Sequence, residues 1–149
     1  MKTCGTAIIY EKDPDHAKLS EMFASCEAAG TTDYVIAVDT KSLDGTIEWI
    51  QNLLGKDANV FPYTFEDSFS VARNLTLAQL PECDWWYWVD SDDTIEMTGG
   101  QTFEEFLSTV PESVSSVYCN YDYERDQFGN STTTHTRGRF YRSNVAWEW

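Results

Sequence analysis

The chain has few basic residues. Its 149 residues contain 10 lysines and arginines against 25 aspartates and glutamates, and the formal net charge is -15. A field of this sign repels phosphate, which argues against duplex nucleic acid and anionic lipid as partners. A phosphorylated ligand would therefore need a metal ion to bind.

Glycine-rich phosphate loops and long hydrophobic runs are also missing. There is neither a G-x-G-x-x-G dinucleotide motif nor a P-loop ending in Lys-Ser or Lys-Thr. No apolar run approaches the length that crosses a bilayer, and the N-terminus lacks a basic-then-apolar leader. Cys4, Cys26, Cys83 and Cys119 have no paired metal-binding spacing, which favours reduced thiols. We therefore expect a cytoplasmic protein with no membrane span.

Hydrophobic and aromatic residues, in contrast, are plentiful. They make up 42% and 15% of the chain, which is typical of a folded globular protein rather than a disordered one. A chain of this length can bury one real core and is too short for two full-sized domains. The sequence therefore predicts a single domain over residues 1–149.

Apolar strands and amphipathic helices alternate along most of the chain. Helices are expected to end at Gly30, at Gly55 and before Pro81, the last of these capped by Ser68. A short helix should run from a capping box at Thr102 to Val110. Buried strands are expected at 6–10, 34–38, 59–63 and 85–89, and an antiparallel pair over 114–121 and a Thr-rich run ending at 142. This order predicts an α/β fold with a mostly parallel central sheet flanked by helices.

Polar loops follow three of these strands and should meet at one edge of the sheet. Ligands bind beyond the carboxyl ends of parallel strands, so these loops are the predicted site. Carboxylates one and two residues apart on a turn can converge on Mg²⁺ or Mn²⁺, which takes substrate phosphates as its other ligands. The loops are Tyr10-Glu11, Asp39-Thr40-Lys41 and Asp90-Ser91-Asp92-Asp93.

Each of these features also has a purely structural interpretation. The acidic turn could simply end a strand in solvent, and Arg73 could form a salt bridge on its helix. Asp44 is well placed to cap the helix that follows it, whereas Asp39 is better explained by ligand contact. Trp147 and Trp149 suit either stacking on a sugar or a hydrophobic contact.

Three segments together resemble the family 2 glycosyltransferases of GT-A fold. They are residues 38–46 (VDTKSLDGT), 69–74 (FSVARN) and 84–93 (DWWYWVDSDD). In that family the corresponding blocks read roughly D-[DT]-G-S-T-D-G-T, F-S-x-A-R-N and D-x-D-[DE], in the same order and at similar spacing. The resemblance covers about residues 4–142. It implies a GT-A (Rossmann-like) fold, with a nucleotide-binding part over 1–98 and a partial acceptor part over 99–149.

The same resemblance implies a reaction and a set of contacts. The reaction is metal-dependent transfer of a sugar from a nucleoside diphosphate sugar to an acceptor, with inversion at the anomeric centre. Asp92 and Asp93 would be the direct ligands of Mn²⁺ or Mg²⁺. Lys41 stands where glycine is usual and could add a phosphate contact. The implied nucleotide-sugar contacts are Tyr10, Glu11, Asp39, Thr40, Lys41, Arg73, Asp90, Ser91 and Asp92.

The C-terminal segment departs from the family pattern. Residues 138–149 resemble a family stretch that continues to a glycine and a His-Glu pair, which are not in this sequence. The catalytic base is therefore open, with Asp122, Glu124 and Glu148 as candidates, and the acceptor could be a glycan, a lipid, a protein or a small molecule. An alternative is a sugar-nucleotide-binding module without turnover. A metal-dependent nucleotidyltransferase should carry a glycine-rich basic loop after its first strand, which residues 10–15 do not provide.

Overall fold

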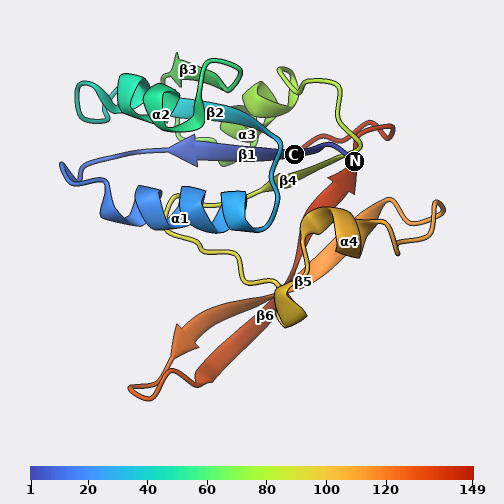
Figure 1. Ribbon diagram of the computed structural model, residues 1–149. Helices are drawn as coiled ribbons and strands as arrows, with labels where there is room; N and C mark the ends of the chain where they lie inside the picture. Colours follow the sequence, from blue (N-terminus) through green and yellow to red (C-terminus); the bar gives the residue numbers. More distant parts are fainter.

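A six-stranded mixed sheet organises the chain in the computed structural model, which describes all residues 1–149 (Figure 1). The strand order is β3-β2-β1-β4-β6-β5. In chain order the elements are β1 (Thr3–Ile9), α1 (Ala17–Ala28), β2 (Asp33–Asp39), α2 (Thr46–Leu54), β3 (Asn59–Tyr63), α3 (Phe69–Leu77), β4 (Trp85–Trp88), the 3-10 helix η1 (Thr98–Gly100), α4 (Phe103–Leu107), β5 (Ser116–Arg125) and β6 (Ser131–Arg142).

The first four strands form the parallel part of the sheet. β1 pairs in parallel with β2 and β4, and β2 pairs in parallel with β3. In β1 and β2 nearly all consecutive positions are buried, so both faces of these strands are covered. The predicted mostly parallel α/β sheet is confirmed.

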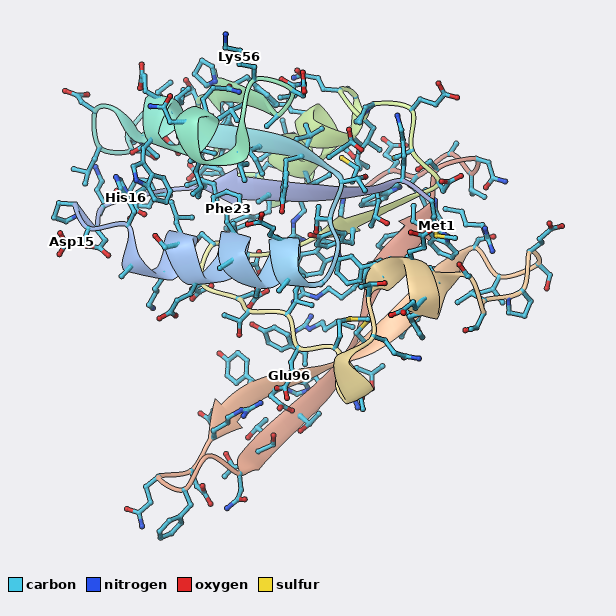
Figure 2. The ribbon with its side chains drawn as sticks, viewed as in Figure 1. Met1, Asp15, His16, Phe23, Lys56 and Glu96 are labelled. Atoms are coloured by element: carbon cyan, nitrogen blue, oxygen red, sulfur yellow. The ribbon has the colours of Figure 1, made fainter.

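Helices cover both faces of this sheet. The main core packs Leu19, Met22 and Phe23 of α1, with residues of α2 and α4, against one face, and Figure 2 shows the Phe23 side chain between α1 and the sheet. Smaller clusters around Val35 and Ala72 fill the face beneath α3. No helix is long and apolar enough to cross a membrane.

The antiparallel part begins where β6 pairs with β4. Tyr87 lies opposite Phe140, and the β5–β6 hairpin then projects from the layered part of the molecule (Figure 1). The predicted antiparallel pair is confirmed, although β5 continues to Arg125 instead of ending at residue 121.

Two of the predicted helix caps are present in the structure, and a third is not. The Ser68 side chain accepts the amide of Val71, and Thr102 forms a capping box with Glu105, both as predicted. The prediction that Asp44 caps α2 is wrong. Gly45 occupies the N-cap with a φ of 83° and no side-chain cap, a left-handed conformation that glycine adopts without steric cost.

Candidate functional site

A cleft of about 430 Å³ lies at the carboxyl ends of β1, β2 and β4. Its size is in the range of small-molecule sites. It brings together six of the nine predicted nucleotide-sugar contacts, which come from three loops and one helix: Tyr10, Asp39, Lys41, Arg73, Asp90 and Ser91. The remaining lining residues are Ile8, Tyr63, Phe65 and Phe69, none of which the sequence analysis assigned to the site.

The cleft has aromatic walls. Tyr10 and Phe69 are 57% and 66% exposed, and the Phe69 ring lies 5.0 Å from the ring of Phe65 between centroids. Exposed rings of this kind offer flat apolar surface to a planar ligand. Phe69 is the first residue of the F-S-V-A-R-N block, so its position in that motif could have indicated that it belongs to the site.

Asp39 is a nearly buried carboxylate in the cleft wall. It is 5% exposed and lies opposite Tyr63 in the β2–β3 register. Its Oδ1 accepts the Lys41 amide at 2.7 Å, which shapes the loop, whereas Oδ2 has no hydrogen bond within the chain. Burial and the Asp39 charge raise the pKa of Tyr63 to about 12. Asp39 can therefore accept a hydrogen bond from a ligand N–H or hydroxyl group.

Arg73 connects α3 to the acidic turn. Its Nη2 donates to Asp90 Oδ1 at 3.3 Å, and its guanidinium lies 4.1 Å from the Trp88 ring centre and 4.5 Å from that of Trp149. Burial, followed by the charge of Asp93, raises the pKa of Asp90. The salt bridge considered for Arg73 thus exists, but it joins two elements at the cleft rather than two residues of one helix.

The formal charges that line the cleft cancel. Asp39 and Asp90 are balanced by Lys41 and Arg73, although the whole chain carries -15. The site is thus a locally neutral patch where an anionic ligand meets less repulsion than elsewhere on the surface.

Glu11 does not line the cleft but holds its loops together. Its amide donates to Ser42 Oγ at 3.0 Å, and its carbonyl accepts the Leu43 amide at 2.9 Å. Its carboxylate is buried and lies 3.3 Å from His16 Nδ1. Figure 2 shows His16 at the loop beyond the end of β1. These contacts fix the loop after β1 against the loop after β2.

Thr40 also lies outside the cleft. Its Oγ1 is 3.4 Å from Thr64 Oγ1, and the residue is exposed beside a smaller hollow formed by the loop before α2. Of these two segments, Tyr10, Asp39 and Lys41 therefore line the cleft, and Glu11 and Thr40 do not.

The three carboxylates of the acidic turn have different surroundings. Asp93 Oδ2 accepts from Arg139 Nη2 at 3.1 Å, and its Oδ1 accepts from the Tyr121 hydroxyl at 2.9 Å. Asp90 is paired with Arg73, whereas Asp92 is exposed and forms no side-chain hydrogen bond or ion pair.

No cluster of three or more His, Cys, Asp or Glu side chains is arranged to hold a metal ion. Because Mg²⁺ needs only one or two carboxylates beside substrate phosphates, the free Asp92 fits such a shared site.

The candidate catalytic bases come from two parts of the chain, the hairpin and the C-terminal segment. Asp122 and Glu124 are on the projecting hairpin, where Asp122 pairs with Arg125 at 2.8 Å and Glu124 accepts from Thr133 at 3.2 Å. Hydrogen bonds, chiefly from Ser131, lower the pKa of Asp122, which weakens it as a base. Neither residue lines the cleft.

The C-terminal residues lie closer to the site. The Trp149 amide donates to Asn74 Oδ1 at 3.0 Å, and its ring contacts Trp88 at a centroid distance of 5.5 Å. Trp147 instead packs on Tyr141, at 4.7 Å between ring centroids. Glu148 is exposed, and the ring of its neighbour Trp149 lies against Arg73, which lines the cleft. Of the three base candidates, Glu148 is therefore the one adjacent in sequence to a residue that contacts the cleft lining.

Comparison with known proteins supports the fold. No protein-family model matches the chain, and no curated protein matches it by sequence. Among solved structures it is similar to S. aureus TarS 1-349 in complex with UDP, with a TM-score of 0.52, 18% identity, and 96% of this chain and 47% of that chain covered. It is also similar to 4-diphosphocytidyl-2C-methyl-D-erythritol synthase, with a TM-score of 0.57, 11% identity, and 96% and 76% covered.

These similarities establish a GT-A-like α/β fold. At such low identities they carry no residue-by-residue assignment. The chain spans about half the length of the TarS 1-349 structures it matches, with 47% of that chain covered.

Proposed function

We propose that the chain binds a nucleoside diphosphate sugar in the cleft and transfers the sugar to an acceptor hydroxyl with inversion. The observation that carries this proposal is the convergence of six predicted contacts on one cleft of about 430 Å³. The fold shared with a TarS structure containing UDP supports the same ligand class. The acceptor class stays open.

The cleft residues suggest a division of labour. The rings of Tyr10 and Phe69 offer stacking surface to the base, and the free Oδ2 of Asp39 accepts from a base N–H or a ribose hydroxyl. Lys41 and Arg73 supply positive charge for the diphosphate. Charge-assisted contacts of this kind stabilise the leaving group where negative charge develops.

We propose that Asp92 holds Mn²⁺ or Mg²⁺ together with the diphosphate. Its exposed carboxylate has no competing partner in the chain. Such an ion, when bound, neutralises negative charge on the departing diphosphate. Asp90 is bonded to Arg73 through Oδ1 only, and its side chain is 49% exposed, so its other oxygen is free to meet the ribose or the metal.

A second candidate function is nucleotide-sugar binding without transfer. It is favoured by one observation: none of Asp122, Glu124 and Glu148 lines the cleft. A metal-dependent hydrolysis assay separates the two functions. Release of free sugar from the bound donor requires a competent site, whereas a pure binding module leaves the donor intact.

Calorimetry with UDP, GDP and dTDP, with and without Mn²⁺, tests the proposal. At least one diphosphate should bind, and Mn²⁺ should tighten its binding. Asp92→Asn should abolish the effect of Mn²⁺, and Asp39→Asn should weaken binding with or without the metal. Glu104→Gln is a matched control, because it removes one carboxylate charge on α4 at the N-terminal amine. The proposal fails if none of the three diphosphates binds in the presence of Mn²⁺.

A further inference from the structure

Arg139 and Tyr121 reach the acidic turn from the β5–β6 hairpin. Arg139 Nη2 donates to Asp93 Oδ2 at 3.1 Å, and its Nη1 donates to the Trp88 carbonyl at 3.1 Å. The Tyr121 hydroxyl donates to the other oxygen of Asp93 at 2.9 Å. The Arg139 and Asp93 side chains are each only 11% exposed, so this ion pair is shielded from solvent.

Trp88 lies between two arginines that hold different ends of the turn. The Arg139 guanidinium is 3.7 Å from the Trp88 ring centre, and that of Arg73 is 4.1 Å from it. Arg73 pairs with Asp90, and Arg139 pairs with Asp93. The indole face attracts both cations, which partly offsets their mutual repulsion. The turn is thus fixed from α3 on one side and from β6 on the other.

Both oxygens of Asp93 already have donors. Oδ2 also accepts the Asp90 amide at 3.2 Å, so this carboxylate takes three hydrogen bonds from three segments of the chain. A metal ion bound directly to Asp93 would have to replace donors and sit beside the Arg139 cation. Asp92 presents neither obstacle.

We propose, on the basis of the nucleotide site proposed above, that Asp93 is a positioning residue rather than a metal ligand. Arg139 and Tyr121 hold it, and through it they fix the backbone that presents Asp90 and Asp92 to the diphosphate. The hairpin is therefore part of the donor site, although none of its residues lines the cleft. Residues that orient the ligands of a metal commonly change metal affinity or activity by about 10- to 100-fold when mutated.

The test compares three variants of the ion pair with the metal-site variant Asp92→Asn. The three are Asp93→Asn, Arg139→Gln and the double variant that combines these two. The probes are the diphosphate that binds the parent chain and its nucleoside, which lacks phosphates, each titrated with and without Mn²⁺. Each single variant at the Asp93–Arg139 pair should weaken diphosphate binding by about 10-fold. The double variant should be no weaker than the singles, because both remove the same interaction. All three should still be tightened by Mn²⁺, because Asp92 is intact, although less than the parent, because the turn that presents Asp92 is less well fixed. All three should keep the parent affinity for the nucleoside.

Tyr121→Phe guards against variants that fail to fold. It removes one hydrogen bond to Asp93 and leaves the ion pair, so diphosphate affinity should fall by only about threefold. Unchanged near-ultraviolet circular dichroism shows that the variant is folded.

Two results would overturn the positioning role. Loss of the Mn²⁺ effect in Asp93→Asn but not in Arg139→Gln would make Asp93 a metal ligand. Parent-like diphosphate affinity in all the pair variants would show that the pair does not position the turn. If the parent chain binds none of the diphosphates, the proposed function itself fails and this inference fails with it, whereas normal binding by the parent isolates the question of Asp93.

Discussion

The parallel part of the sheet and the β5–β6 hairpin differ sharply in burial. β1, β2 and β4 consist largely of buried residues, whereas β5 has none and β6 has only Phe140. All residues that line the cleft belong to β1–β3, to α3 or to the loops that follow β1–β4, and none belongs to the hairpin. The hairpin bonds the carboxylate of Asp93 through Arg139 and Tyr121. Stability and ligand geometry should therefore be separable by mutation.

The largest expected effect is on the stability of the parallel part. Trp85→Ala should lower the free energy of unfolding by about 3–5 kcal/mol, because it empties a large site in the core. Trp85 is fully buried at 0% exposure. Urea denaturation followed by circular dichroism measures the change.

Trp85→Phe provides the matched control for that experiment. The indole Nε1 of Trp85 has no hydrogen-bond partner, so phenylalanine keeps most of the apolar contact and removes an unsatisfied N–H. It should cost clearly less than alanine. Equal destabilisation by both substitutions would contradict this account of the core.

Arg73→Ala should reduce affinity more than stability. Loss of a charge-assisted contact to a diphosphate should weaken nucleoside diphosphate binding by about 1.5–3 kcal/mol. The effect on unfolding should be smaller, because its partner Asp90 is 49% exposed. Calorimetry and thermal melting give the two values.

Arg125→Ala is the corresponding control on the hairpin. Arg125 pairs with Asp122 at 2.8 Å and is 52% exposed. Both its affinity and its melting temperature should match the parent chain. A large loss of affinity in this variant would show that charge anywhere on the molecule governs binding.

The contact of Tyr121 with the acidic turn should be visible at high pH. Burial and then its hydrogen bond to Asp93 raise the pKa of Tyr121 to about 12. Because the folded pKa exceeds the ordinary value near 10, the associated stability is present below about pH 10 and is lost as the pH rises toward 12. After allowance for solvent screening, it should amount to less than about 1 kcal/mol.

Urea denaturation of the parent and Tyr121→Phe between pH 9 and 12 isolates this contribution. Other tyrosines titrate in both proteins, so the informative quantity is the stability difference between the two. That difference should shrink as the pH rises. A constant difference across the range would mean that the Tyr121 hydroxyl does not hold Asp93.

The smallest effect is expected at the hairpin tip. Phe128 is 80% exposed, so Phe128→Ala should change the free energy of unfolding by no more than about 0.5 kcal/mol. Diphosphate affinity should also be unchanged, as measured by calorimetry. A marked loss of affinity would place the tip of the hairpin, and not only its root, in the site.

Local sequence patterns predicted the features that depend on neighbouring residues. The apolar runs located the buried strands, and the caps at Ser68 and Thr102 follow from side chains that bond amides three residues away. The Asp44 prediction failed because Gly45 begins α2 in a backbone conformation that no periodic pattern reveals.

Contacts between distant segments could not be predicted in this way. Arg139 lies 46 residues after Asp93, and Tyr121 lies 28 residues after it. Their meeting depends on the register with which β6 joins β4 and β5. Glu11 was correctly placed at the strand edge, but its side chain turns to His16 rather than to the cleft, since loop packing decides side-chain direction.

The neutral cleft in a strongly acidic chain has a kinetic consequence. An anionic donor must cross a negative field before it reaches a site that no longer repels it. Added salt shortens the range of that field, so the association rate constant should rise with ionic strength while the dissociation rate constant changes little. Stopped-flow measurements of binding at increasing concentrations of a non-coordinating salt, with Mn²⁺ held fixed, would show whether electrostatic repulsion during encounter limits the association rate constant.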